Sequence, residues 1–87
     1  MISFYTTSLF ERDVKRLEPE IKELLAEKLE QFADRKNHQT LKVHKLHGAL
    51  KDKYSFSITK SIRVMFSWAD SQSVTLLRVG DHDIYDK

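Results

Sequence analysis

Cysteine is absent from this sequence, and its absence removes several kinds of site at once. Without cysteine there can be no disulfide, no thiolate nucleophile and no zinc-thiolate site. The sequence also lacks a signal peptide and any apolar run long enough to cross a membrane. We therefore expect a cytoplasmic protein that makes no use of a membrane, and the 87 residues predict one domain, 1–87.

Proline and glycine are so scarce that each one marks a boundary. Pro19 breaks a helix and suits the first turn of the next, where its missing N–H costs nothing. Gly48 indicates a turn, and Gly80 ends the last strand. A capping box formed by Ser8 and Glu11 predicts that the first helix begins at Ser8.

Apolar periodicity fills in the elements between these boundaries. A first strand is expected over 1–7, and the second helix should run from Pro19 to about Arg35 or Lys36, where Asn37 could cap its end. A short extended piece is expected at 41–44, followed by strands at 54–58, 62–68 and 73–79. The fold class is therefore α+β: an N-terminal strand and a two-helix hairpin packed on a mainly antiparallel sheet that ends in a three-stranded meander.

Strand alternation divides this sheet into two faces. Tyr54, Phe56 and Val64 belong to a face that should pack against the helices. The second face, defined by Ser55, Ser57, Arg63 and Met65, has no obvious segment left to cover it. We therefore expect it to be open, polar and cationic.

Positive charge is concentrated in one part of the chain. Residues 41–63 contain one acid, Asp52, and six cations, which are Lys42, Lys45, Lys51, Lys53, Lys60 and Arg63. Such an excess fits contact with a polyanion, and equally fits a solvated lysine-rich surface.

Arg63, His82 and Tyr85 are the strongest candidates for chemistry. Arginine can hold a phosphate through two parallel N–H groups, although Arg63 could instead pair with Asp81 or Asp83. Histidine can act as a general acid or base near neutral pH, and tyrosine can stack on a base. His82 could also join Asp81 and Asp83 in a metal site, but their spacing matches no specific ligand pattern. We expect no metal and no cofactor.

His44 and His47 are further candidates. In an extended segment they point to opposite faces, so at most one of them can reach the second face of the sheet. The alternative is that they are solvent-exposed histidines of a basic loop.

An ordered set of segments resembles the RelE/ParE superfamily of bacterial toxins and is most similar to its RelE, YafQ and YoeB branch. The set comprises Lys45-Leu46-His47-Gly48, the Tyr54 strand, Ile62-Arg63-Val64-Met65-Phe66 and Val79-Gly80-Asp81-His82-Asp83-Ile84-Tyr85. The likeness covers nearly the whole chain. It implies a RelE-like fold and the toxin of a type II toxin–antitoxin pair, which cuts mRNA on the ribosome without a metal. It also implies an antitoxin partner and a hetero-oligomeric complex with it.

The resemblance also implies roles for individual residues. Arg63 matches a strand arginine that contacts the scissile phosphate, and His82 a C-terminal acid or phosphate ligand. Tyr85 matches an aromatic that orients the mRNA, and His44 a histidine found in YafQ-type members. The expected RNA-contacting residues are Lys45, Lys51, Lys53, His47, Ser55 and Ser57.

The sequence departs from the family at several of these places. Ser55 and Ser57 stand where RelE has lysines, and the glutamate base of YoeB-type members has no clear counterpart. Two other readings therefore stay open: a ParE-like inhibitor of DNA gyrase, and an inactive toxin relative that only binds an antitoxin.

Overall fold

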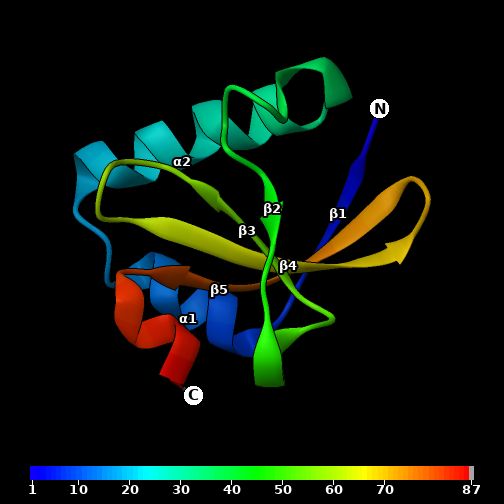
Figure 1. The fold of residues 1–87 in the computed structure, drawn as a ribbon. Coiled ribbons are helices and arrows are strands. Elements are labelled where there is room, and N and C mark those ends of the chain that lie inside the picture. Colours follow the sequence, from blue (N-terminus) through cyan, green and yellow to red (C-terminus); the bar gives the residue numbers. More distant parts are fainter. Residues whose placement is uncertain (87) are drawn as a thin grey trace.

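The computed structural model describes residues 1–86, apart from the side chains of His82 and Asp86. Two helices accompany a five-stranded sheet (Figure 1). The helices are α1 (Ser8–Lys15) and α2 (Pro19–Phe32), and the strands are β1 (Ser3–Thr6), β2 (His44–Lys45), β3 (Tyr54–Ser57), β4 (Arg63–Asp70) and β5 (Ser73–Gly80). Three short 3-10 segments are η1 (Arg35–Asn37), η2 (Gly48–Leu50) and η3 (His82–Asp86).

The strand order is β1-β5-β4-β3-β2, so β1 and β2 form the two edges of the sheet. β1 runs parallel to β5, whereas the other neighbouring pairs are antiparallel. This arrangement confirms the predicted α+β class and the meander of the last three strands. Among the residues that the structure describes, no helix is long and apolar enough to cross a membrane.

The first helix is capped by Thr7, so the predicted Ser8 cap is wrong. Thr7 Oγ1 accepts from the Phe10 N–H at 3.0 Å and donates to the Leu77 carbonyl oxygen at 2.9 Å. The Thr7 N–H also bonds to the Leu76 carbonyl oxygen. Glu11, the other half of the expected capping box, accepts from Thr6 Oγ1 instead. The contacts of Thr7 with β5 fix the helix start, and no local sequence pattern shows them.

α2 ends at Phe32, earlier than the predicted end at Arg35 or Lys36. Asp34 then caps η1 by accepting from the Lys36 N–H at 3.1 Å. Asn37, the last residue of η1, does cap the end of α2, because its side-chain amide donates to the Gln31 carbonyl oxygen at 2.9 Å.

Phe32 is the centre of the core between α2 and the sheet. Its fully buried ring lies 4.8 Å from Phe56 and 5.0 Å from Phe66, centroid to centroid. On the other side, the ring stacks on His38 at 4.3 Å, and His38 Nε2 lies 2.8 Å from the Phe32 carbonyl oxygen. These contacts confirm that the predicted face of β3 and β4 packs against the helices.

Candidate functional site

The register of the sheet brings most of the predicted site residues to one face. His44 pairs with Ser55, Ser55 with Met65, and Met65 with Arg78, so these four side chains form one row across β2, β3, β4 and β5. A second row comprises Ser57, Arg63 and Gly80. Because paired residues share a face, His44 joins the second face defined by Ser55, Ser57, Arg63 and Met65, as the alternation of residues 44 and 47 allowed.

The second face is not fully open, and this expectation is wrong. The C-terminal segment η3 folds back over it: Tyr85 Oη lies 2.6 Å from Ser55 Oγ, and Ile84 is buried. Ser55 and Met65 are consequently buried as well. Asp81 starts the segment by accepting from the Asp83 N–H at 3.0 Å. The burial of Ile84 depends on contacts made in the folded chain, and no local pattern in the tail shows it.

Arg63 is held by a neighbouring serine. Its Nη1 donates to Ser57 Oγ at 2.7 Å, and its side chain is half-buried. Among the described residues it forms no ion pair, so the alternative of a partner at Asp81 or Asp83 is not found. One contact to a neutral hydroxyl leaves the charge and the remaining N–H donors of the guanidinium for an anionic ligand.

Arg78 is a cation of this face that the sequence interpretation missed. Its side chain is only 17% exposed, and it donates to both carboxylate oxygens of Asp13, at 2.7 and 3.1 Å. Asp13 also accepts from the Val79 N–H at 3.1 Å. Asp13 follows Phe10 and precedes Val14 on the buried stripe of α1. An acid inside an apolar helical stripe is the signal that could have revealed the pair.

The Asp13–Arg78 pair alters the acidity of both groups. Burial raises the pKa of Asp13, but the hydrogen bonds from Arg78 and Val79, together with the charges of Arg78 and Arg16, outweigh it and lower that pKa below its usual value. The hydrogen bond to Asp13 likewise raises the pKa of Arg78. Asp13 therefore keeps its negative charge at neutral pH and neutralises Arg78.

The basic residues expected to contact RNA surround the end of β2 and the loop after it. His47 and Lys51 are exposed on either side of η2, and Lys53 is half-buried just before β3. Lys45 is exposed but pairs with Tyr54, so it belongs to the face opposite His44. In Figure 1 the β2–β3 loop and the C-terminal tail lie at the same lower end of the molecule.

The remaining predicted residue, His82, begins η3, and its side chain lies outside the described part of the structure. Within the part that is described, no group of three His, Asp or Glu side chains could hold a metal ion. The proposed grouping of His82 with Asp81 and Asp83 stays untested.

Solved structures resemble this arrangement over almost its whole length. A chain of the RelBE2 toxin–antitoxin complex from Mycobacterium tuberculosis matches with a TM-score of 0.76 and 21% identity, covering 93% of this chain and 98% of that one. YafQ from Escherichia coli matches with a TM-score of 0.72 and 14% identity over 100% of both chains. The YoeB–YefM complex from Staphylococcus aureus matches with a TM-score of 0.74 and 16% identity, covering 94% and 98%.

The chain has the fold of the RelE/ParE toxins. By sequence, no protein-family model matches it, and no curated protein does. The RelE-type fold therefore rests on the structure, and it confirms the fold that the ordered segments from Lys45 to Tyr85 implied. At these identities the likeness establishes the architecture, whereas the chemistry must be argued from the chain's own side chains.

Proposed function

We propose that this chain is the toxin of a type II toxin–antitoxin pair and cuts mRNA on the ribosome without a metal. The observation that supports this most is the second face of a RelE-type sheet, where His44, Arg63 and Tyr85 come together from β2, β4 and the C-terminal tail. Ser57 and Ser55 hold the last two in place.

Arg63 supplies the charge that RNA cleavage needs. The ribose 2′-OH attacks the adjacent phosphorus, the bond to the 5′ oxygen breaks, and the products are a cyclic phosphate and a free 5′-OH. Negative charge grows on the phosphoryl oxygens during this step, and a guanidinium that is already anchored stabilises it without reorganising. The hydrogen bond from Arg63 to Ser57 provides that anchor.

His44 is suited to the role of general base. Its Nδ1 lies 2.8 Å from the Lys42 carbonyl oxygen, which can only accept a hydrogen bond. The Nδ1 atom therefore carries the proton, and Nε2 of the neutral ring has the lone pair that can take a proton from the 2′-OH. His82 is then assigned as the acid that protonates the leaving 5′ oxygen, and Tyr85 as the residue that orients the RNA.

The basic surface and the fold suggest the partners. His47, Lys45, Lys51 and Lys53 would meet the phosphates of mRNA and ribosomal RNA. The RelBE2 and YoeB–YefM structures are toxin–antitoxin complexes. We infer that this chain likewise forms a hetero-oligomer with an antitoxin protein.

Primer extension on mRNA in a reconstituted translation system tests the proposal, with and without ribosomes. We expect cuts inside codons that require ribosomes. Arg63→Gln should slow cleavage by about 10²–10³-fold, the effect of removing one preorganised donor from a transition state. His44→Gln and His82→Ala, which remove the assigned base and acid, should abolish cleavage. Lys60→Gln, which removes an exposed cation from the turn before β4, is the matched control.

The alternatives give different results in the same assay. Intact mRNA from folded wild-type protein would contradict the nuclease proposal. Accumulation of gyrase-cleaved DNA would then indicate a ParE-like activity, and unaffected growth on strong expression would indicate a binding protein. Full cleavage by Arg63→Gln would contradict the role assigned to Arg63, but not the proposal that the protein cuts mRNA.

A further inference from the structure

The exposed large apolar side chains of the described residues all come from the first nine positions. Met1 is 91% exposed, Tyr5 is 59% exposed and Leu9 is 46% exposed. They belong to β1, the residue pair before it and the first turn of α1. All three side chains come from one continuous segment, so β1 and its flanks are the candidate interaction surface among the described residues.

β1 is also an edge strand whose backbone is available. The N–H groups of Ser3 and Thr7 bond to carbonyl oxygens at positions 72 and 76, on the β5 side. In a parallel ladder alternate residues face the neighbouring strand. The peptide groups of Phe4 and Thr6 therefore point away from β5, toward the open edge of the sheet.

Nothing in the sequence of β1 protects this edge. Residues 1–10 contain no Lys, Arg, Asp, Glu or Pro. Natural edge strands usually carry charge, proline or a bulge that prevents another strand from pairing with them. The opposite edge, β2, is protected in that way, because it has two residues and one of them is Lys45. The difference suggests that β1 is kept free for a partner.

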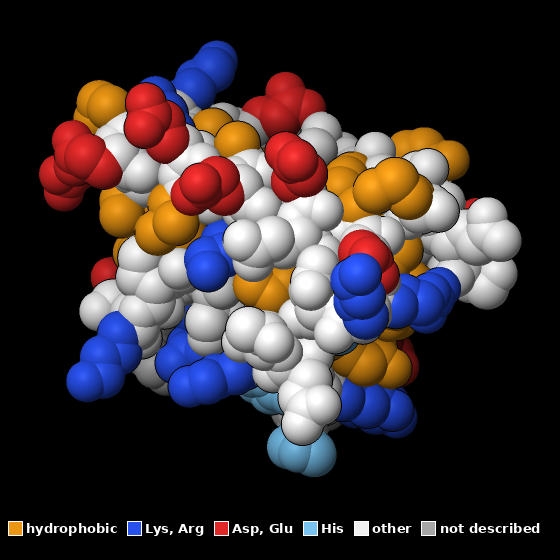
Figure 2. Space-filling model, turned by 90° about the horizontal axis from the view of Figure 1, so that it is seen from above, with side chains coloured by type: hydrophobic (Ala, Val, Ile, Leu, Met, Phe, Trp, Pro, Cys, Tyr) orange, Lys and Arg blue, Asp and Glu red, His pale blue; other side chains and the backbone are white. Residues whose placement is uncertain are grey.

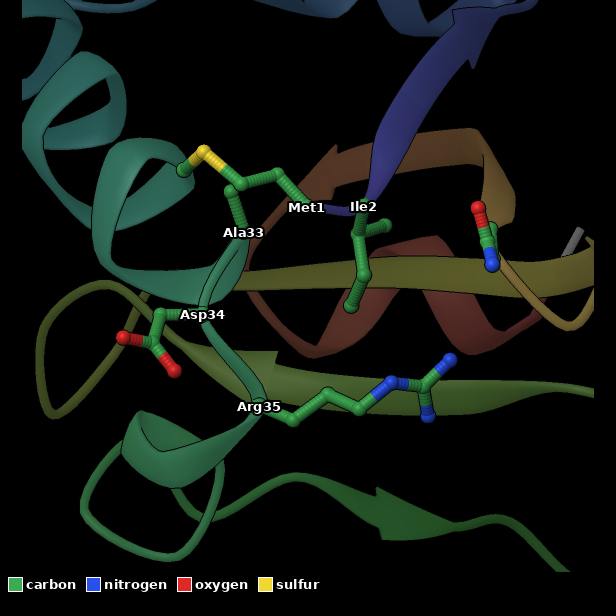
Figure 3. Close-up of a pocket in the computed structure, with 6 residues that line it drawn as sticks. Met1, Ile2, Ala33, Asp34 and Arg35 are labelled. Carbon is green, nitrogen blue, oxygen red and sulfur yellow. The ribbon is translucent and has the colours of Figure 1, made fainter.

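Two depressions lie at the start of β1, and the charges that line them indicate which kind of partner could bind there. The first, of about 510 Å³, is lined by Met1, Ile2, Ala33, Asp34, Arg35 and Gln72 (Figure 3). The second, of about 500 Å³, is lined by Met1, Glu27, Glu30, Gln31, Asp34 and Asn37. The two share Met1 and Asp34, so they adjoin at the beginning of the strand.

The charged groups of these depressions are mostly acidic. Glu27, Glu30 and Asp34 line the second depression, and Figure 2 shows acidic side chains next to apolar ones on the side of the molecule where α2 lies. Lys36 pairs with Asp34 at 3.6 Å, but it is 80% exposed. The Arg35 guanidinium is already engaged, since it donates to the Ser71 carbonyl oxygen and lies 4.9 Å from the Trp68 ring centroid.

We propose that the β1 edge accepts an extended segment of a second protein, which pairs with Phe4 and Thr6 and places Lys or Arg against Glu27, Glu30 and Asp34. Main-chain hydrogen bonds along the strand supply affinity, and apolar side chains of the segment cover Tyr5. A second copy of this chain is a poorer occupant, because its own residues 1–10 bring no cation to the acidic wall. The inference does not require that the protein cut RNA.

The test is selection from a displayed library of random twelve-residue peptides against the full chain. The selected peptides should alternate apolar and polar residues and carry Lys or Arg at one end. Tyr5→Lys and Glu27→Lys/Glu30→Lys should each weaken their binding at least tenfold. Ser61→Lys, on an exposed turn outside this surface, should leave it unchanged. Bound peptide should slow hydrogen exchange at the Phe4 and Thr6 amides.

Three results would overturn the proposal. The first is selected peptides that bind Tyr5→Lys as well as they bind the wild type. The second is selection of acidic peptides, or of none. The third is a dimer in light scattering that Tyr5→Lys dissociates, with the two amides already protected in the free protein, because the edge would then belong to a second copy.

Discussion

Asp13 shows how one carboxylate can tie a helix to the edge of a sheet. β1 pairs with residues 73–76 of β5. Beyond the end of β1, Asp13 contacts β5 instead, by accepting hydrogen bonds from Arg78 and from the Val79 N–H. Asp13→Asn leaves a charged, 17%-exposed Arg78 without its partner. We expect a loss of about 3 kcal/mol in the free energy of unfolding, measured by urea denaturation.

Glu20→Gln is the matched control, because Glu20 is exposed on α2. Its effect should stay below about 0.5 kcal/mol. An equally small loss for Asp13→Asn would mean that the ion pair does not hold α1 against β5.

The lowered pKa of Asp13 also predicts how stability depends on pH. Its folded pKa lies below the unfolded value of 3.8, so the folded state binds its proton less readily. The stabilisation is therefore complete above that value and is lost as the pH falls through the folded pKa. Urea denaturation between pH 2.5 and 6 should show a steeper acid loss for the wild type than for Asp13→Asn. Parallel curves would contradict the assignment.

Ser55 and Ser57, which we expect to contact RNA, each form a hydrogen bond within the protein. Each fixes a candidate functional side chain, Ser55 through the Tyr85 hydroxyl and Ser57 through Arg63. A double-mutant cycle of Ser55→Ala and Tyr85→Phe should give a coupling energy of about 1 kcal/mol, because either single change already removes the hydrogen bond between the two hydroxyl groups. Ser61→Ala in place of Ser55→Ala should give no coupling with Tyr85→Phe.

At the scale of elements, η3 depends on the absence of a side chain at Gly80. A Cβ there would lie 2.9 Å from Ile84 Cγ2, and the residue has φ +158°. Gly80→Ala should therefore cost about 2–3 kcal/mol, from backbone strain and from the displacement of η3. Gly48→Ala is the matched control: its φ is +69°, but the added Cβ meets nothing within 4 Å. It should cost about 1 kcal/mol, from strain alone.

Backbone strain and the clash with Ile84 can be separated by urea denaturation of four proteins: the wild type, Gly80→Ala, Ile84→Ala and the double variant. If the clash matters, Gly80→Ala combined with Ile84→Ala will cost less than the two single changes added together. Strict additivity would show that η3 does not pack on Gly80.

Elements with a regular pattern were predictable, and elements fixed by distant contacts were not. The alternation of Tyr54, Phe56 and Val64 gave the faces of the sheet correctly, because period-two burial is a local property. The Thr7–Leu77 and Tyr85–Ser55 hydrogen bonds were not predictable, because the bonded residues lie 70 and 30 positions apart in sequence. The same limit hid the Asp13–Arg78 pair. Alternation along the strands placed Arg63 on the second face correctly, but it left open whether His44 or His47 reached that face, and the pairing of His44 with Ser55 decides it.

At the scale of the whole molecule, net charge is small but its two signs are separated. The net charge is +2, yet residues 41–63 carry six cations against one acid, and α2 carries four glutamates against two lysines. A near-neutral protein with this distribution can attract a polyanion on one side only. RNA should therefore contact the β2–β3 region and avoid α2.

The salt dependence of RNA binding measures that asymmetry. Each phosphate contact to a single strand contributes about 0.7 to the slope of log affinity against log salt concentration. Lys51→Gln/Lys53→Gln should therefore reduce the slope by about 1.4, measured by fluorescence anisotropy with a labelled single-stranded RNA over a series of KCl concentrations. Lys22→Gln/Lys28→Gln makes the same change in net charge on α2 and should leave the slope unaltered. Equal slopes for the two double variants would show that net charge, rather than its placement around η2, governs binding.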